Sequence, residues 1–163
     1  MPSSTKWRIY VTANNGGGVP GIGEVEMHSS IGGSDLCTGG TATASSAYSG
    51  SYNADKAFDN NAATFWDASA GVPGWIEYEF ASAQDIVEFS VKAPPTGNVN
   101  DVPKDFSIQY YNGSTWVDTI FRVGESGWSA EEVRTYSASY PALKQVWRLY
   151  ITAIQSGVPG VGE

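Results

Sequence analysis

Residues 7–24 read WRIYVTANNGGGVPGIGE, and residues 147–163 repeat this stretch with few changes as WRLYITAIQSGVPGVGE. In both copies the opening residues alternate apolar with polar side chains, which is the pattern of a β-strand with one buried face. A turn rich in Gly and Pro follows each strand. The turn of the second copy is one residue shorter, and only the first copy continues, with VEM at residues 25–27. The repeated stretch therefore predicts a strand and a turn that this chain contains twice.

Strand-like alternation also runs through the chain between the two copies. Turn residues separate the alternating segments, with 19 Gly and 8 Pro in total, and helix-like spacing is nearly absent. The alternating segments are residues 75–80, 85–91, 105–110 and 133–136. An Asn-Gly pair at residues 112–113 signals a hairpin, and residues 41–46 are typical of an edge strand or of a linker. We expect an all-β fold, an antiparallel β-sandwich of two packed sheets.

The length and the charge limit the domain organisation and the partners. A chain of 163 residues is long enough for one domain with a sizeable core. We expect a single sandwich over residues 1–163, with its core at about residues 31–163 and with residues 7–27 as a duplicate of residues 147–163. The chain has 9 basic and 17 acidic residues, a net charge of −8, and its basic residues are scattered singly. This distribution speaks against nucleic acid as a partner.

The sequence also bears on localisation. No stretch approaches the roughly 20 apolar residues of a membrane-spanning helix, so we expect no insertion into membranes. The N-terminal residues lack the apolar stretch of a signal peptide. We therefore expect the chain to reach an extracellular or virion-surface location by another route, as part of a virus particle or of a longer exported polypeptide. The single Cys37 cannot form a disulfide within the chain.

Side chains suited to catalysis are scarce. Cys37 with His28 is the only candidate for a nucleophile and a base, and we expect instead an inert thiol and a solvated histidine after a strand. Glu77 and Glu79 form a carboxylate pair, but the two-residue period of a strand puts both on a solvated sheet face. A second pair, at residues 131–132, lies in a turn. We expect no enzymatic activity.

Residues 54–66, ADKAFDNNAATFW, place several oxygen-bearing side chains in a short loop that ends on an aromatic anchor. Asp59 offers a carboxylate, Asn61 an amide or a main-chain carbonyl, and Thr64 a hydroxyl and a carbonyl. These groups are the hard ligands that calcium prefers. The alternative is an Asx-turn loop whose polar side chains cap its own backbone.

This loop resembles the signature of the discoidin family, also called coagulation factor V/VIII C-type domains. In that family Ala, an aliphatic or aromatic residue, Asp, Gly and Asn or Asp are followed by Thr-x-Trp. Residues 57–61 and 64–66 match, with Asn60 where Gly is usual. That departure is mild, because Asn tolerates the left-handed backbone conformation better than most residues. The likeness continues in residues 75–80, 103–110, 112–116 and 147–152.

The resemblance implies a β-sandwich of jelly-roll type, shared with galactose-binding domains and family 32 carbohydrate-binding modules. Members of the family bind glycans, lipid head groups or proteins through loops at one end, and they are usually non-catalytic. Many hold a structural calcium ion in the signature loop. Carried over to this chain, the resemblance implies calcium as a structural cofactor with ligands Asp59, Asn61 and Thr64, completed by Glu163 or Glu24.

One domain of this kind needs the repeated strand once, so the second copy allows three interpretations. The copies could mark the boundaries of successive modules in a repeat array, as in the phage tail fibres whose discoidin-like segments this sequence resembles. The N-terminal copy could instead complete the open edge of a neighbouring module, so that chains run head to tail into a fibre. In the third interpretation both copies pair as ordinary strands within one sandwich.

Sugar binding needs a flat aromatic face and polar groups that fix the hydroxyls. Trp128 lies in the loop at residues 124–129 and is our first candidate for stacking on a sugar; the alternative is that it packs on the sandwich edge. The tryptophans in strand or anchor positions are expected in the core; they are Trp66, Trp75, Trp116 and Trp147. The hydroxyl partners suggested by loop position are Asp67, Asn98, Asn100 and Asp101.

Together these features predict a non-catalytic carbohydrate-binding or adhesion module of an extracellular or virion-surface fibre. Its expected ligand is a cell-surface glycan or polysaccharide. The alternative is a purely structural module that polymerises head to tail by strand exchange through the duplicated segment, with neighbouring copies of the module as its partners.

Overall fold

The computed structural model describes residues 2–137, which form β-strands joined by loops and short 3-10 helices. The strands are β1 (Ser3–Asn14), β2 (Gly21–Ile22), β3 (Glu24–His28), β4 (Thr41–Ala44), β5 (Trp66–Asp67), β6 (Gly74–Asp85), β7 (Glu88–Lys92), β8 (Pro103–Tyr111), β9 (Trp116–Arg122) and β10 (Val133–Ser137). The helices are η1 (Gly50–Tyr52), η2 (Ala54–Ala57) and η3 (Val99–Asp101). The strand pairs are antiparallel, which confirms the predicted all-β sandwich.

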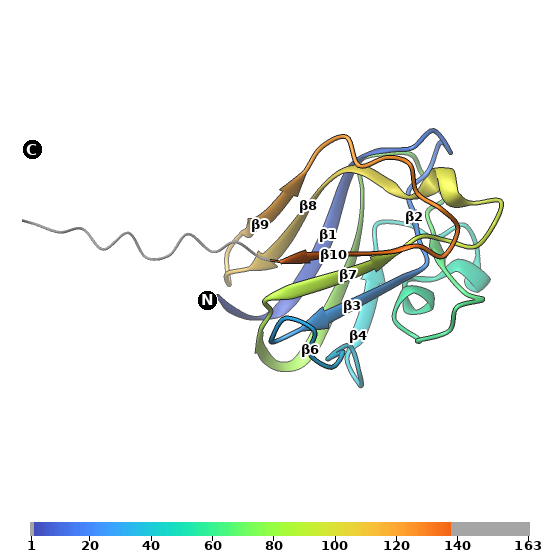
Figure 1. The fold of residues 1–163 in the computed structure, drawn as a ribbon. Helices are drawn as coiled ribbons and strands as arrows, with labels where there is room; N and C mark the ends of the chain where they lie inside the picture. Colours follow the sequence, from blue (N-terminus) through green and yellow to red (C-terminus); the bar gives the residue numbers. More distant parts are fainter. Residues whose placement is uncertain (1, 138–163) are drawn as a thin grey trace, which may run out of the picture.

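Two sheets form the layers of the sandwich. The larger sheet has the order β4-β6-β1-β8-β9 and the smaller one the order β10-β7-β3, while β2 and β5 form a short third pair. Figure 1 shows the smaller sheet lying across the larger one. The facing side chains of the two sheets form one core, in which the ring of Trp7 on β1 lies 5.7 Å from the ring of Phe89 on β7.

The N-terminal copy of the repeated stretch lies at the centre of this fold. Its strand β1 pairs with β6 on one side and with β8 on the other, so that Ile9 faces both Ile76 and Ile108. The core therefore begins with the first copy, whereas we expected it at about residues 31–163. That expectation treated the first copy as the extra one, although its apolar alternation suits a central strand. The second copy lies outside the described residues, so the three interpretations of the repeat stay predictions.

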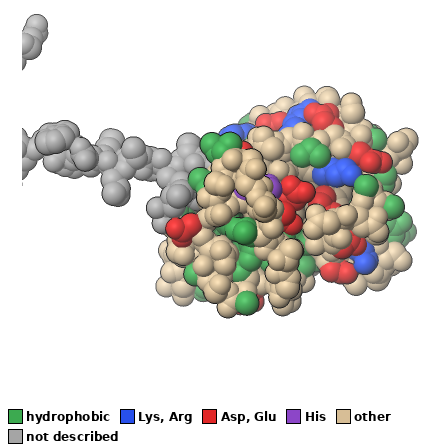
Figure 2. All heavy atoms as spheres, turned by 60° about the horizontal axis from the view of Figure 1, so that its bottom comes forward, with side chains coloured by type: hydrophobic (Ala, Val, Ile, Leu, Met, Phe, Trp, Pro, Cys, Tyr) green, Lys and Arg blue, Asp and Glu red, His purple; other side chains and the backbone are tan. Residues whose placement is uncertain are grey.

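The outer face of the larger sheet carries charged residues. Glu77 and Glu79 lie on this face, where their carboxylates are 3.5 and 3.1 Å from the ammonium group of Lys6 on the neighbouring strand. The two carboxylates therefore share one sheet face as predicted, but only Glu79 is well exposed to solvent, and Glu77 is mostly covered. Figure 2 shows another face of the molecule, on which basic side chains occur singly among acidic ones.

Three tryptophans that we expected in the core lie within the described residues. Trp66 is fully buried, as expected. Trp75 and Trp116 are only half-buried, so the prediction was wrong for these two. In β6 the inward position belongs to Ile76, which leaves Trp75 on the outer face. On the same sheet the guanidinium group of Arg8 lies 4.1 Å from the centre of the Trp116 ring and covers part of it.

The predicted hairpin and edge strand are both present. Gly113 adopts a φ of 97° in the turn between β8 and β9, and the side-chain oxygen of Asn112 accepts backbone hydrogen bonds from Ser114 and Thr115. Strand β4 pairs with β6 at the edge of the larger sheet. Residues 41–44 are therefore an edge strand and not part of a linker.

Loops gather at one end of the sandwich, on the right in Figure 1, which we call the loop end. Residues 15–20, 45–65, 94–102 and 123–132 meet there. Backbone hydrogen bonds tie some of these loops together, as between the Gly17 N–H group and the Asn100 carbonyl at 3.1 Å. Among residues 2–137, no helix has the length and apolar character of a membrane span.

Candidate functional site

A hollow opens at the loop end where several connections meet. Its volume is about 250 Å³, and its lining residues are Asn15, Val99, Asn100, Gly127 and Trp128. Asn15 comes from the connection between β1 and β2, and Val99 and Asn100 come from η3. Gly127 and Trp128 come from the connection between β9 and β10. The side-chain N–H of Asn15 donates to the Val102 carbonyl at 3.1 Å, which fixes the first of these loops beside η3.

Trp128 forms a wall of this hollow and not an open platform. Its side chain is 9% exposed, and the guanidinium group of Arg134 lies 3.9 Å from the ring centre. The indole N–H group is buried and has no hydrogen-bond partner within the described part of the chain. This burial agrees with packing on the sandwich edge, which was our alternative, and ligand stacking by Trp128 stays a prediction.

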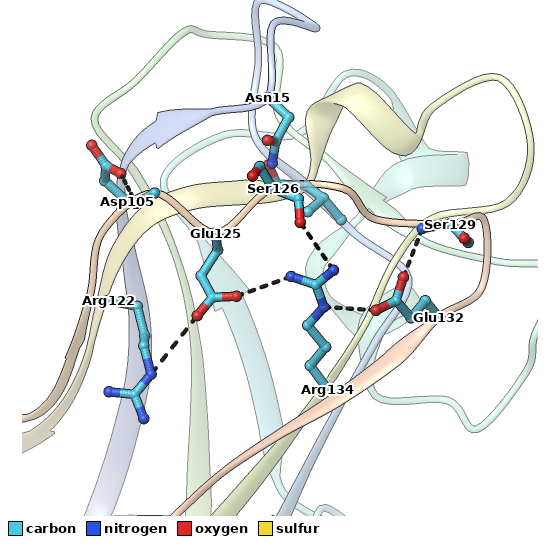
Figure 3. Close-up of polar contacts among 10 residues, drawn as sticks. Asn15, Asp105, Arg122, Glu125, Ser126, Ser129, Glu132 and Arg134 are labelled. Carbon is cyan, nitrogen blue, oxygen red and sulfur yellow. Dashed lines mark hydrogen bonds and ion pairs between the residues drawn. The ribbon is translucent and has the colours of Figure 1, made fainter.

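Arg134 holds the loop that carries this tryptophan (Figure 3). Its Nη1 and Nε atoms pair with the carboxylates of Glu125 at 3.0 Å and Glu132 at 2.7 Å. Its Nη2 donates to the Ser126 carbonyl at 3.1 Å. The carboxylate of Glu132 also accepts the backbone N–H of Ser129 at 2.7 Å. Its hydrogen bond with Arg134 is the main reason that the pKa of Glu132 is lowered, so one arginine cross-links both ends of the loop at neutral pH.

The structure brings most of the predicted ligand contacts to this end of the sandwich. Trp128 and Asn100 line the hollow. Asn98 directly precedes the helix η3 and Asp101 is its last residue; the Asn98 amide donates to the Asp101 carboxylate at 3.3 Å. Asp67 does not line the hollow but is buried beside Asp101, whose charge acts on it.

The Asp67 carboxyl group is buried next to β2. Burial first, and the charge of Asp101 second, raise its pKa from the ordinary 3.8 to about 6. Its Oδ1 atom has no hydrogen-bond partner within residues 2–137. A Cβ atom at Gly21 would lie 3.2 Å from this oxygen and 3.0 Å from Cβ of Asp101, so the two strands approach closely there because one residue is glycine. Asp67 is therefore placed to affect the packing of the loops, and a contact between Asp67 and a ligand stays a prediction.

The signature loop forms the turn that its sequence predicts. The Oδ1 atom of Asp59 accepts the backbone N–H of Asn61 at 3.1 Å and lies 2.8 Å from the hydroxyl oxygen of Thr64. The same hydroxyl lies 2.9 Å from the Asn61 carbonyl. The ammonium group of Lys56 is 3.6 Å from Oδ2 of Asp59. The three predicted calcium ligands thus lie together, and they also satisfy one another in the manner of an Asx turn.

Glu24 is buried beside this loop. Its side chain is 7% exposed, and neither carboxylate oxygen has a hydrogen-bond partner among the described residues. Burial is the main reason that its pKa rises to about 7, and the charge of Asp59 adds to this shift. The nearby backbone amide of Asn60, although outside hydrogen-bond geometry, favours the charged carboxylate and opposes the shift. Orphaned carboxylate oxygens beside further oxygen ligands fit a hard cation. The other candidate ligand, Glu163, lies outside the described residues.

The donor set is short of charged groups. Within residues 2–137, no group of three or more His, Cys, Asp or Glu side chains could hold a metal ion. A cation here would be held by the two carboxylates of Glu24 and Asp59 together with neutral oxygens from the loop. Calcium accepts such mixed oxygen sets.

The sequence pattern of the F5/8 type C domain matches residues 41–157, which is more than half of the chain. The chain belongs to the F5/8 type C domain family. Members of this family are commonly carbohydrate- or ligand-binding modules, are typically non-catalytic and usually occur in extracellular or secreted proteins. A comparison with curated proteins and one with solved structures found no match.

Two reactive residue types in this F5/8 type C domain are buried. Burial, with a smaller contribution from Asp35, raises the pKa of the Cys37 thiol, so the thiol stays protonated at neutral pH. His28 is 5% exposed, and its Nε2 atom lies 3.1 Å from the Ser90 hydroxyl and 3.5 Å from the Glu26 carboxylate. The expectation of a solvated histidine was therefore wrong, because His28 lies on β3 and not after a strand.

Sequence reasoning missed two residues at the loop end of this F5/8 type C domain. Asn15 lines the hollow, but it belongs to the repeated stretch, which we analysed for strand pattern only. Tyr48 is 69% exposed, and its ring packs edge-on at 5.9 Å from that of Tyr52. It lies in a Gly- and Ser-rich stretch that showed no aromatic periodicity. A second hollow of about 360 Å³ includes its neighbour Ala47 in its lining.

Proposed function

We propose that this F5/8 type C domain binds a carbohydrate in the hollow at the loop end. The observation that carries this proposal is the hollow itself, whose lining includes two asparagines, Asn15 and Asn100. An amide offers both a donor and an acceptor, which suits the adjacent hydroxyls of a sugar ring. Trp128 supplies part of the wall of the hollow.

The exposed ring of Tyr48 indicates a second candidate position for sugar binding. Its exposed ring is the kind of flat face that stacks on a sugar, whereas the ring of Trp128 is covered by Arg134. The hollow beside Tyr48 is lined by small and polar residues that include Asn53 and Asp55. The two positions lie on different loops, so substitutions separate them.

A glycan array, followed by calorimetry on the best sugar, tests the proposal with calcium present. We expect Asn15→Ala and Asn100→Ala to weaken binding each by about fivefold to tenfold, the effect of one or two lost hydrogen bonds. Gln84→Ala is the control, since this half-buried residue pairs with Ser4 at the opposite end of β1. Loss of binding in Tyr48→Ala alone would move the site to Tyr48. No binding of any sugar would reject the proposal.

We further propose that the signature loop and Glu24 hold a structural calcium ion. The ligands would be the carboxylates of Glu24 and Asp59 with oxygens of Asn61 and Thr64. The support is the pair of orphaned Glu24 oxygens next to the loop. Calcium would be a positively charged partner for this buried carboxylate, and would so stabilise the loop end.

We infer from the family that the domain works outside the cell, as an adhesion module of a larger assembly. The repeat is the only feature that suggests a fibre on a virion surface or elsewhere, with neighbouring copies as partners. Light scattering over a dilution series tests this part. Particles larger than one chain, absent when residues 147–163 are deleted, would support head-to-tail assembly through the duplicated segment, and a monomer throughout would reject it for this chain.

A further inference from the structure

Residues 7–24 fill a slot in the body of the sandwich. We use this word for the space between β6 and β8, continued along β5, in which β1 and β2 pair with their neighbours. The side chains that residues 7–24 bury there are those of Trp7, Ile9, Val11, Ile22 and Glu24. The larger sheet is complete only when this slot is filled, because β1 lies in its middle.

Residues 147–163 offer the same kinds of side chains in the same order. The counterparts are Trp147, Leu149, Ile151, Val161 and Glu163. Leu149 has as many carbon atoms as Ile9, and the carbon gained at Ile151 is offset by the carbon lost at Val161. Core substitutions that conserve the total volume are tolerated best. The second copy therefore meets the packing demands of the slot.

The two copies also agree in the polar face of their strand and in the tight turn that follows it. Arg8, whose Nε donates to the Gln109 side chain at 2.6 Å, recurs as Arg148. A Cβ atom at Gly23 would lie 2.5 Å from the Ala93 carbonyl oxygen, so this position has no room for a side chain. The second copy has glycine at this position too, and it keeps the preceding Pro-Gly pair.

The family comparison gives separate information about the two copies. The F5/8 type C pattern matches residues 41–157, so it includes most of the second copy and leaves out β1, β2 and β3. In the structure, the first copy fills the slot. The first copy thus fills the slot in the structure, while the second copy is the one that the family pattern includes in large part.

We propose that residues 147–163 are a second occupant of the slot and exchange with residues 7–24 within one chain. Both segments are tethered to the same body, and a tethered segment has an effective concentration far above that of another chain. Either occupant completes the larger sheet, so exchange preserves the core. The displaced copy becomes a free strand whose apolar face fits only a vacant slot of the same kind. This proposal does not depend on the sugar or on calcium.

Differences between the copies set the balance of the exchange. Asn14 and Asn15 donate side-chain hydrogen bonds of 2.6 and 3.1 Å to backbone carbonyls, whereas Ile154 and Gln155 stand at the equivalent positions. The first copy also continues directly into β3, residues 24–28, which is part of the smaller sheet. We expect the first copy to be the major occupant and the second copy the minor one.

Substitutions in the two copies test the exchange in the full chain. Ile9→Asp places a charge at a buried position of the slot, and Leu149→Asp makes the equivalent change in the second copy. A variant with both changes disables both proposed occupants. Val133→Asp is the control, because this side chain is 55% exposed. Hydrogen exchange of residues 7–12 and 147–152 reports which copy is in the slot, and thermal unfolding reports whether the fold survives.

We expect Ile9→Asp to keep a cooperative unfolding transition and to transfer protection to residues 147–152, whose amides should exchange about tenfold slower than in Leu149→Asp. Leu149→Asp should unfold like wild type, and the double variant should lose the transition. Loss of the transition in Ile9→Asp alone, with residues 147–152 unprotected, would overturn the proposal. Protection of residues 147–152 that grows with protein concentration would overturn exchange within one chain. A stable double variant would show that the slot needs neither copy, and would also reject the proposal.

Discussion

At the scale of single residues, Asn60 shows how one backbone angle limits a substitution. It stands where the family usually has Gly, and its φ is 55°, in the left-handed region. We expect Asn60→Gly to change the free energy of unfolding little and Asn60→Val to lower it by about 1–2 kcal/mol, because a β-branched residue is strained at this angle. Denaturant unfolding in the presence of chelator measures both variants. Equal stability would mean that the loop relaxes without strain.

Glu24 carries the calcium proposal at the same scale. Its two oxygens are buried without hydrogen-bond partners among the described residues, so in chelator Glu24→Gln should leave the protein at least as stable as wild type at neutral pH. Saturating calcium should stabilise wild type by about 2.7 kcal/mol at 100 times the dissociation constant. The variant should gain much less. Thermal unfolding with and without calcium decides, and an equal gain in both proteins would exclude Glu24 as a ligand.

Asp67 gives the domain a predictable dependence on pH. Its pKa is about 6 in the folded state against an ordinary 3.8, so between these values the folded state binds more protons than the unfolded state. The free energy of unfolding should therefore fall as the pH rises from about 4 to about 6 and change no further through Asp67 above that. Asp67→Asn should remove about 1–3 kcal/mol of this fall. A pH series of denaturant unfolding curves is the measurement, and an unchanged slope in the variant would contradict it.

At the scale of elements, the sequence predicted the long strands and missed the short ones. Strands β1, β6 and β8 alternate over many residues, and a two-residue period then leaves few alternatives. Strands β2 and β5 have two residues each, too few to show any period. The same two-residue period puts Trp75 on the outer face of β6. The prediction that Trp75 lies in the core followed its aromatic character and not this period. Most of the predicted ligand contacts reached the loop end because they lie in the connections there, whereas the burial of Trp128 depends on contacts across the fold.

The loop between β9 and β10 depends on Arg134, whose charge is shared by Glu125 and Glu132. We expect Arg134→Gln to lower the free energy of unfolding by about 1–3 kcal/mol, since both carboxylates lose a charged hydrogen-bond partner. The emission of Trp128 should also shift to longer wavelength as the loop opens to water. Arg122→Gln is the matched control, because its nearest contact to Glu125 is 3.9 Å. Identical behaviour of the two variants would show that Arg134 does not hold the loop.

At the scale of the whole molecule, the two sheets depend on a small set of large side chains that meet between them. Phe89 on β7 is fully buried and packs on Trp7 of the larger sheet. It belongs to neither copy of the repeated stretch, so an exchange of occupants in the slot cannot compensate for its loss. We expect Phe89→Ala to lower the free energy of unfolding by about 3–5 kcal/mol, through lost burial and the cavity left behind.

Denaturant unfolding followed by tryptophan emission and by circular dichroism measures this effect. The two signals should give one midpoint, shifted to lower denaturant in Phe89→Ala, because one core joins both sheets and small domains unfold as a unit. Val133→Ala is the control and should stay within about 0.5 kcal/mol of wild type, since its side chain is largely exposed. Separate midpoints for the two signals in wild type would mean that the sheets unfold independently. The slot at the centre of the larger sheet would then be able to open without unfolding the smaller one, and exchange of its occupants would be a local event.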